Sequence, residues 1–339
     1  MSFTMDISKV KKKVTVHQVA KEAGVSASTV SRFLNQTTFV AEDKRKQILE
    51  AIRKTGYQSQ AENSKSSALG SRTIGVLVQN PESPHNTRIL EDMEKVLFSY
   101  GYSTLIAAGH WKIKNQLHGL EYLKKSGVDG VIAVMGNLKD EHIQEYAKTI
   151  PVIAVGYRIS GHNVHSLCID NTIGGYMATL HLLQKGHKRI AHIKGVQEQP
   201  DGVTRCEGYK RALIEAGLNI DPQLIKQGDF GSELGYKKTI ELIESRTSFT
   251  AIFAANDQTA YGAIKAIHDK GLRVPEDIAV IGFDDLATSR YFTPSLTTMR
   301  QPIEEIGAIC AESMVRFLEA GKQLKPRLPP IELLVRQST

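Results

Sequence analysis

Two groups of polar side chains in this 339-residue chain have types and spacings suited to binding a ligand. The first group lies near the N-terminus, where Arg32 can donate two parallel hydrogen bonds to a guanine base. Ala27 and Ser28 can contact thymine methyl groups and base edges, while the neighbouring hydroxyl groups suit DNA phosphates. These residue types suit contact with double-stranded DNA, provided that a helix presents them to the major groove. The candidate DNA-binding residues are Thr15, Ser26, Ala27, Ser28, Thr29, Ser31, Arg32 and Asn35.

The second group follows strand-like runs in the large C-terminal part of the chain. Its carboxylates, amides and single guanidinium suit a hydroxyl-rich ligand, with Phe230 or Phe283 as a stacking face. A lone Asp or Asn after a strand is commonly the N-cap of the next helix, and we expect that role for Asp257 and Asp285. Only the joint placement of these residues therefore indicates a ligand site. The group comprises Asp170, Asn171, Arg205, Asn256, Asp257, Asp284, Asp285 and Gln301.

The charge of the chain is unevenly distributed. Residues 1–72 contain 13 Lys or Arg and 6 Asp or Glu, a net charge of +7, which is also the net charge of the whole chain. Residues 73–339 are therefore neutral. Concentrated positive charge attracts phosphate backbones and releases their counterions, which favours nucleic acid as the partner of the N-terminal segment. A solvated basic tail is the alternative, and residues 1–13 fit it, but residues 14–57 are too regularly patterned.

Three short helices are predicted between residues 14 and 57. Thr15 can cap the first helix, and Gly24 suits the tight turn that ends it. Ser26 can cap the second helix, residues 27–34, and the third runs over residues 42–55. Two helices around such a turn form a helix-turn-helix, whose second helix enters the major groove. The residues expected on the buried faces are Val16, Val19, Ala20, Val25, Val30, Phe33, Leu34, Ile48, Leu49 and Ile52.

The segment VHQVAKEAGVSASTVSRFLN, residues 16–35, resembles the DNA-binding headpiece of the lactose/galactose repressor family. The helix predicted after Val40 resembles the third helix of that headpiece. The motif is long and specific. It implies an operator-binding transcription regulator, and a small three-helix unit that binds nothing is the disfavoured alternative.

Residues 58–72 are rich in Gln, Ser, Asn, Lys and Gly, which predicts a linker between domains. In the family that the headpiece resembles, this region is a hinge helix that wedges a leucine into the minor groove. Here Ser66 occupies the usual leucine position and Ser59 a usual proline position. Either Leu69 serves as a displaced wedge or the protein binds without one. The poor helix formers in this stretch favour the second alternative.

Strand-like and helix-like segments alternate from residue 73 to the C-terminus. This alternation predicts parallel sheets covered by helices on both faces. The units are too numerous for one small sheet, so we expect a two-lobed α/β domain over residues 73–339. Ligands of such folds lie at the carboxyl ends of the strands, here between the lobes.

The C-terminal part of the chain resembles the effector domain of the same repressor family. The resemblance implies a fold like that of periplasmic sugar-binding proteins, with three crossovers between the lobes, dimerisation, and a small sugar-like effector. After the first strand the family usually has Asn-Pro-Phe-Phe, whereas residues 80–85 read NPESPH, so this side of the pocket should be more polar. The matching segments are DNTIGG at 170–175, RCEGY at 205–209, AND at 255–257 and VPEDIAVIGFDD at 274–285. The implied effector-binding residues are Asp170, Arg205, Phe230, Asn256, Asp284 and Gln301.

Two other classes of protein compete with this interpretation. An enzyme is disfavoured because the chain has no phosphate-binding loop, no dinucleotide fingerprint and no nucleophile elbow. A transport-type binding protein would need a signal peptide and would not need the basic headpiece. The N-terminus has no apolar signal-peptide core and no apolar run could span a bilayer, so we expect a cytoplasmic homodimer that binds operator DNA and an effector. We expect no cofactor and no metal, because the three cysteines and the histidines His85, His110 and His118 are scattered.

Overall fold

The computed structural model describes residues 15–35, 42–55, 70–197, 199–321 and 327–339. The chain divides into two compact units, Met1–Ser71 and Arg72–Thr339, and each is described by itself. The predicted basic tail of residues 1–13 lies outside the described residues. The same holds for most of the predicted linker, including Ser59, Ser66 and Leu69.

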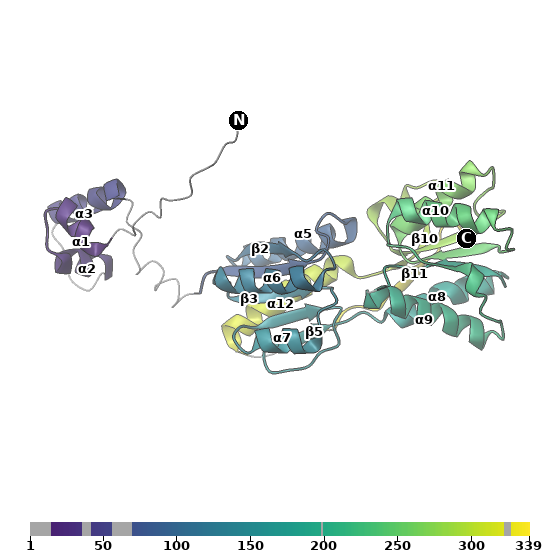
Figure 1. Ribbon diagram of the computed structural model, residues 1–339, viewed down its shortest axis with the longest axis horizontal. Coiled ribbons are helices and arrows are strands. Elements are labelled where there is room, and N and C mark those ends of the chain that lie inside the picture. The colour runs from purple at the N-terminus through teal and green to yellow at the C-terminus, as the bar shows by residue number, and fades with distance from the viewer. Residues whose placement is uncertain (1–14, 36–41, 56–69, 198, 322–326) are drawn as a thin grey trace, which may run out of the picture. The chain divides into compact units, whose positions relative to one another are not determined.

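The described residues of the first unit form three helices, α1 (Val16–Glu22), α2 (Ala27–Asn35) and α3 (Glu42–Thr55), shown in purple in Figure 1. Gly24 takes a positive φ of 64° between α1 and α2, a conformation that glycine adopts without steric cost. The predicted helix-turn-helix is therefore present. Its buried core comprises Val19, Ala20, Ala23, Val30, Ile48 and Ala51.

One core residue of this unit was predicted wrongly. Leu49 is 50% exposed, and Ala51 is buried instead beside Ile48. On a helix, residues three apart share a face whereas adjacent residues point about 100° apart, so Ile48 and Ala51 can face α1 together. Leu49 then falls at the edge of that face.

The second unit consists of two lobes, each built on a sheet with helices on both faces (Figure 1). The first sheet has the order β2-β1-β3-β4-β5, and all its neighbouring strands are parallel. Its strands are β1 (Thr73–Val78), β2 (Ser103–Ala108), β3 (Gly130–Val134), β4 (Val152–Val155) and β5 (Val164–Leu167). Its helices are α5 (Pro84–Ser99), α6 (Ile113–Lys125), α7 (Asp140–Ala147) and α12 (Ile303–Ala320).

The alternating side chains of β1 explain why helices cover both faces of this sheet. Ile74 and Val76 pack in one apolar cluster with residues of α5 and α12, whereas Leu77 packs in another with residues of α6 and α7. Successive side chains of a strand point to opposite faces, and all of β1 from Ile74 to Val78 is buried or nearly so. A parallel strand with both faces covered has this continuous apolar sequence.

The second sheet has the order β11-β10-β9-β8-β6-β7, with only the edge strand β11 antiparallel to its neighbour among the described pairs. Its strands are β6 (Ile190–Ile193), β7 (Ile225–Lys226), β8 (Ala251–Ala254), β9 (Ala279–Asp284), β10 (Thr297–Arg300) and β11 (Glu332–Leu334). Its helices are α8 (Asn171–Gln184), α9 (Pro200–Glu215), α10 (Ser232–Glu244) and α11 (Asp257–Asp269). Two short 3-10 turns complete the lobe, η1 (Pro222–Leu224) and η2 (Ala287–Arg290).

The chain passes between the lobes three times, as predicted. It leaves the first lobe after β5, returns after β10 to form α12 on the first sheet, and goes back to β11 in the second. Residues 168–170 form the first passage and residues 301–302 the second. Gln301 therefore lies on a segment that joins the two lobes.

Candidate functional site

Three of the eight residues predicted to contact DNA lie on the exposed face of α2, and Ser26 immediately precedes this helix. Ser26 caps this helix, because the backbone N–H of Thr29 donates to Ser26 Oγ at 3.1 Å. Ser28, Ser31 and Arg32 are exposed. A cap fixes the N-terminal turn of a recognition helix, which is the part that approaches base edges.

The other predicted DNA-binding residues take more varied positions. Thr15 precedes α1, and its backbone N–H donates to Gln18 Oε1 at 2.8 Å. Ala27 and Thr29 are half-buried, and Ala27 packs against the core of the unit. Asn35 belongs to α2, but its side chain lies outside what the structure describes.

A cleft of about 650 Å³, open to solvent, lies between the two lobes of the second unit. Four of the six predicted effector-binding residues line it, namely Arg205, Phe230, Asn256 and Asp284. The lining from the first lobe is Asn80, Ser83, His85, Asn86, Trp111 and Met135. The lining from the second lobe is Val196, Gln199, Asp201, Arg205, Asp229, Phe230, Asn256, Gln258 and Asp284.

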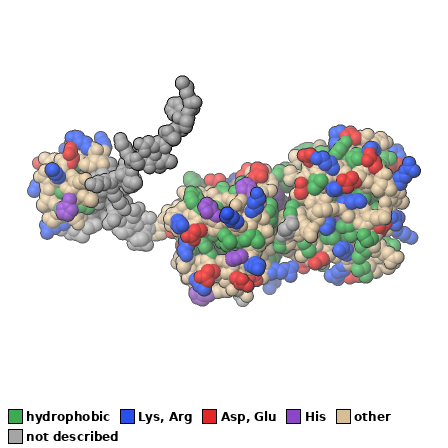
Figure 2. Space-filling model, viewed as in Figure 1, with side chains coloured by type: hydrophobic (Ala, Val, Ile, Leu, Met, Phe, Trp, Pro, Cys, Tyr) green, Lys and Arg blue, Asp and Glu red, His purple; other side chains and the backbone are tan. Residues whose placement is uncertain are grey.

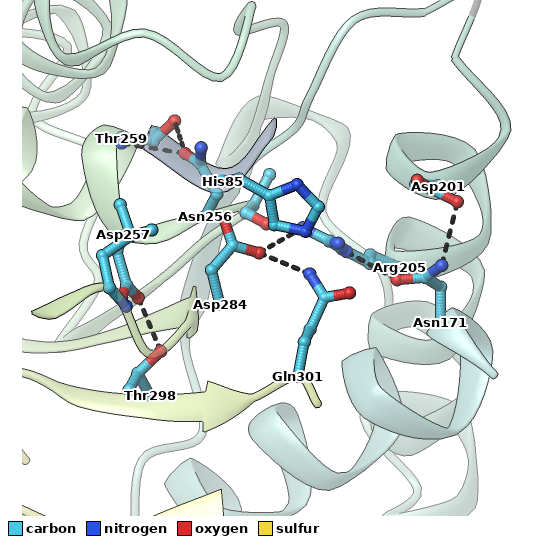
Figure 3. Close-up of polar contacts among 12 residues, drawn as sticks. His85, Asn171, Asp201, Arg205, Asn256, Asp257, Thr259, Asp284, Thr298 and Gln301 are labelled. Atoms are coloured by element: carbon cyan, nitrogen blue, oxygen red, sulfur yellow. Dashed lines mark hydrogen bonds and ion pairs between the residues drawn. The ribbon is translucent and has the colours of Figure 1, made fainter. Parts of the chain in front are cut away.

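Arg205, on α9, is held rigidly in the wall of the cleft (Figure 3). Its Nε donates to Asn171 Oδ1 at 2.9 Å, and its Nη1 donates to the carbonyl oxygen of Ala255 at 2.6 Å. The guanidinium carbon lies 3.7 Å from the centre of the Phe283 ring. Phe283 is fully buried and therefore supports Arg205, whereas Phe230 lines the cleft. A guanidinium fixed by hydrogen bonds and stacking meets a ligand at little further entropic cost.

Asp284, the last residue of β9, pairs with Arg205 and is held by Gln301. The Nη1 of Arg205 lies 3.7 Å from Asp284 Oδ1, and both side chains are only 4% exposed. Gln301 Nε2 donates to the same oxygen at 2.6 Å. Gln301 does not line the cleft, so it positions Asp284 rather than facing a ligand.

Asn256 caps α11, because the backbone N–H of Thr259 donates to Asn256 Oδ1 at 2.9 Å. The prediction that Asp257 is a cap is therefore wrong. Asp257 is fully buried and accepts from the backbone N–H of Leu286 and from the hydroxyls of Ser289 and Thr298. Burial, with Asp284 nearby, raises the pKa of Asp257 to about 7 although these three hydrogen bonds lower it.

Two further predicted roles also need correction. Asp285 does not cap the following turn, and instead pairs with Arg336 at 2.6 Å. Asp170 lies outside the lining of the cleft, where it is exposed and accepts from the backbone N–H of Ile173 as the N-cap of α8. Its neighbour Asn171 is buried and holds Arg205.

The cleft contains an aromatic side chain that the sequence analysis missed. Trp111, in the loop after β2, lines the cleft from the first lobe with a positive φ of 58°. Glu82 and Ser83 stand where the family usually has two phenylalanines, which predicted a more polar lobe, but Trp111 supplies an apolar face from another loop. Its only sequence signal was that it is the sole tryptophan of the chain.

Phe230 faces the cleft from the second lobe, and Gly195 makes room for its ring. A Cβ atom at Gly195 would lie 2.0 Å from Phe230 Cζ, closer than any real contact. Trp111 and Phe230 thus offer aromatic surface from opposite lobes. Small-molecule sites typically combine apolar walls of this kind with a few hydrogen-bonding groups.

Two polar residues of the lining were also missed as site residues. Asp201 is 9% exposed, and its Oδ1 accepts from Asn171 Nδ2 at 2.9 Å. Burial raises the pKa of Asp201, although Arg205 and His85 lower it. The Nε2 of His85 is buried with no hydrogen-bond partner among the described residues. A buried polar atom of this kind is available to a ligand.

Within the described ranges, no cluster of three or more His, Cys, Asp or Glu side chains could hold a metal ion. No described helix is long and apolar enough to cross a membrane.

Known proteins resemble both units of the chain. Residues 15–60 match the family described as bacterial regulatory proteins, lacI family, and residues 179–339 match the periplasmic binding protein-like domain. The HTH-type transcriptional repressor PurR of Erwinia tasmaniensis is 36% identical over 296 residues, which cover 86% of this chain and 87% of that repressor. PurR of Histophilus somni is 34% identical, and the match covers 96% of this chain and 98% of that repressor.

Solved structures give the same result over nearly the whole chain. The transcriptional regulator CelR in complex with cellobiose has a TM-score of 0.70 and 29% identity, with 96% of this chain and 100% of that chain covered. The lac repressor dimer bound to operator and the anti-inducer ONPF has a TM-score of 0.73 and 25% identity, with 96% and 99% covered.

A helix-turn-helix unit joined to a two-lobed unit with an interlobe cleft defines the class of DNA-binding regulators that respond to ligands. The chain belongs to the lacI family of bacterial regulatory proteins. It is a DNA-binding transcriptional repressor and not an enzyme. The predicted family and fold class are thereby confirmed.

Proposed function

We propose that a small hydroxyl-rich effector, a sugar, sugar acid or sugar phosphate, binds in the interlobe cleft and controls the operator affinity of this repressor in the cytoplasm. The observation that carries the proposal is the composition of the cleft. The second lobe supplies the Arg205–Asp284 pair, the Asn256 amide and the Phe230 ring. The first lobe supplies the Trp111 ring. Paired donors and acceptors beside aromatic faces suit a sugar ring. The cellobiose complex of the similar regulator CelR supports the same ligand class.

The mechanism follows from the position of the cleft. A ligand that contacts residues of both lobes stabilises the arrangement in which the lobes are close together. Such a ligand shifts DNA binding only by its differential affinity for the two lobe arrangements. Gln301 lies on a passage between the lobes and bonds to Asp284, so it connects the cleft to the segment that must bend.

We assign DNA recognition to residues 14–57, the connection to residues 58–72, and effector binding and dimerisation to residues 73–339. Arg32, exposed on α2, reads a base pair, and Ala27 and Ser28 contact neighbouring bases. Thr15, Ser26, Thr29, Ser31 and Asn35 set the orientation of the headpiece on the phosphates.

An apolar surface of the first lobe suits dimerisation. Figure 2 shows hydrophobic side chains among the charged ones on the surface of this lobe. Several exposed apolar side chains on neighbouring elements suit an interface between proteins, and a symmetric dimer implies a pseudo-palindromic operator. The exposed residues of this surface, on or next to α5, β2 and α6, are Phe98, Tyr100, Ile106, Ile113, Leu117 and Tyr122.

A two-part experiment tests the proposal. The full chain is screened by thermal shift against sugars, sugar acids, sugar phosphates and nucleosides, because a ligand of the folded state raises the melting temperature. Each compound that raises it is then added to a titration of an operator duplex selected from genomic DNA. We expect a stabilising sugar compound to change operator affinity about ten-fold or more. A compound that binds without any change in operator affinity would contradict the proposal, as would stabilisation by nucleosides alone.

A further inference from the structure

The charged side chains that line the cleft are unbalanced. The described lining contains three carboxylates, Asp201, Asp229 and Asp284, and Arg205 is its one Lys or Arg side chain. Residues 73–339 as a whole are balanced in charge, because they contain equal numbers of acidic and basic side chains. The excess of carboxylates is therefore a local property of the cleft.

Arg205 does not compensate all three carboxylates. Its nearest carboxylate oxygen is Asp284 Oδ1, 3.7 Å from Nη1, and the same nitrogen donates to the carbonyl of Ala255. Its Nε is occupied by Asn171. The guanidinium of Arg205 therefore forms its ion pair with Asp284. Among the described residues, Asp201 and Asp229 have no ion pair with a cationic side chain.

Asp201 is the more informative of the two because it is nine-tenths buried. It is bonded to the neutral amides of Asn171 and Gln199. Burial raises the pKa of Asp201 although Arg205 and His85 lower it, in keeping with a carboxylate that has no ion pair among the described residues. A ligand ammonium group would supply the missing charge and favour the ionised form of this carboxylate.

Asp229 and the two aromatic rings point to the same ligand chemistry. Asp229 is exposed at the cleft, and its Oδ1 accepts from the backbone N–H of Gly231 at 2.8 Å. A cation is attracted to the faces of aromatic rings, as the Arg205 guanidinium carbon 5.7 Å from the centre of the Phe230 ring shows, and Trp111 lies in the same lining. Carboxylates together with aromatic faces attract an amine and repel a phosphate or a second carboxylate.

We propose that the cleft selects an effector that bears an amine, of the amino-sugar class, over sugar acids and sugar phosphates. The inference rests on the proposed function and narrows its ligand class. The ammonium group pairs with Asp201 and Asp229, while the ring hydroxyls bond to Arg205, Asp284 and Asn256.

Matched sugars test this selectivity. Glucosamine, N-acetylglucosamine, glucose, gluconate and glucose 6-phosphate, with the galactose series, are titrated into the full chain while Trp111 fluorescence is recorded. Trp111 is the sole tryptophan, so the signal reports on the cleft. We expect an amine to bind at least about ten-fold tighter than its neutral or N-acetylated counterpart, and the anionic compounds to bind more weakly than the neutral sugar.

Variants assign the effect to the buried carboxylate. Asp201→Asn keeps an oxygen for the Asn171 bond and removes the charge, so it should abolish the preference for the amine. Glu276→Gln removes one negative charge from an exposed position outside the lining and should keep the preference. Tighter binding of a sugar acid or phosphate than of its neutral or amine counterpart would overturn the inference while leaving the proposed function intact.

A second readout needs no effector. Caesium and iodide ions quench tryptophan on collision, and a negative cleft admits the cation more readily than the anion. Relative to Glu276→Gln, the double variant Asp201→Asn/Asp229→Asn should show stronger iodide quenching and weaker caesium quenching of Trp111, with their ratio changed about two-fold. An unchanged ratio would overturn the inference. If no sugar binds, the proposal that the effector is a sugar is wrong. The ratio of iodide to caesium quenching then still tests whether the cleft prefers a cation.

Discussion

Arg205 Nη1 lies 3.7 Å from Asp284 Oδ1, and each side chain is only 4% exposed. Removal of the guanidinium would leave a buried carboxylate without a countercharge. We therefore expect Arg205→Leu to lower the free energy of unfolding by about 3–5 kcal/mol. Adding Asp284→Asn should restore part of that loss, because the pair is then removed as a unit. Urea unfolding of the two single variants and the double variant checks this, and strictly additive losses would contradict it.

His192 should make the stability of the second unit depend on pH. Burial between the rings of Tyr209 and Phe253, with centroids 5.0 and 4.6 Å away, lowers its pKa to about 4. As pH falls, the unfolded chain takes up this proton near pH 6.5 and the folded chain only near pH 4. The stability that neutral His192 contributes is therefore fully present above pH 6.5 and is lost as pH falls towards 4.

Thermal unfolding of His192→Phe beside the unmodified chain measures this effect. Between pH 7 and pH 5 the unmodified chain should lose about 2 kcal/mol more than the variant. His118→Gln, which replaces an exposed histidine of α6, should retain the original pH dependence. Parallel pH profiles for the chain and His192→Phe would show that His192 does not stay neutral.

Arg32→Ala should weaken operator discrimination more than overall DNA affinity. The side chain is exposed on α2, and a lost guanine contact costs about 1–3 kcal/mol on the specific site alone. Binding is measured on operator and random duplexes. Lys21→Ala, which removes a charge from α1, should at most weaken both equally. If Arg32→Ala lowers the affinity for both duplexes equally, Arg32 contacts only phosphate.

Phe98→Ser should weaken the dimer. Phe98 is 79% exposed on α5, and burial of such a ring in an interface is worth about 1.5–3 kcal/mol. Sedimentation equilibrium should show a dimer dissociation constant raised at least about ten-fold, with weaker operator binding. Ile214→Ser, at a 62% exposed position of α9, is the matched control and should leave the dimer unchanged. A dimer unaffected by Phe98→Ser would place the interface elsewhere.

Local signals predicted the headpiece closely. The caps Thr15 and Ser26, the glycine turn and the apolar spacing all act within a few residues, so the sequence alone identifies α1 to α3. Leu49 was assigned wrongly because helical spacing indicates a broad apolar stripe but not where the partner helix covers it.

The cleft was predicted only in part, because its geometry depends on residues far apart in the chain. Asn256 and Asp284 lie at strand ends and Arg205 lies in the helix that follows β6, and all three were identified, whereas Trp111 enters from a loop with a left-handed backbone. Whether a strand-end carboxylate caps a helix or becomes buried depends on its neighbours, which is why Asp257 was assigned wrongly.

A ligand in the interlobe cleft is proposed to control DNA binding, and Gly195→Ala provides the sharpest check on this coupling. The added Cβ would collide with the Phe230 ring and push it into the cleft, so the variant should fold without binding the effector. Gly161→Ala, whose Cβ would meet Val164 at an ordinary 3.6 Å, is the control. The measurement is an operator titration with and without a sugar that stabilises the unmodified chain. We predict an affinity change of about ten-fold or more in the unmodified chain and in Gly161→Ala, and none in Gly195→Ala. A full response from a folded Gly195→Ala would contradict the account.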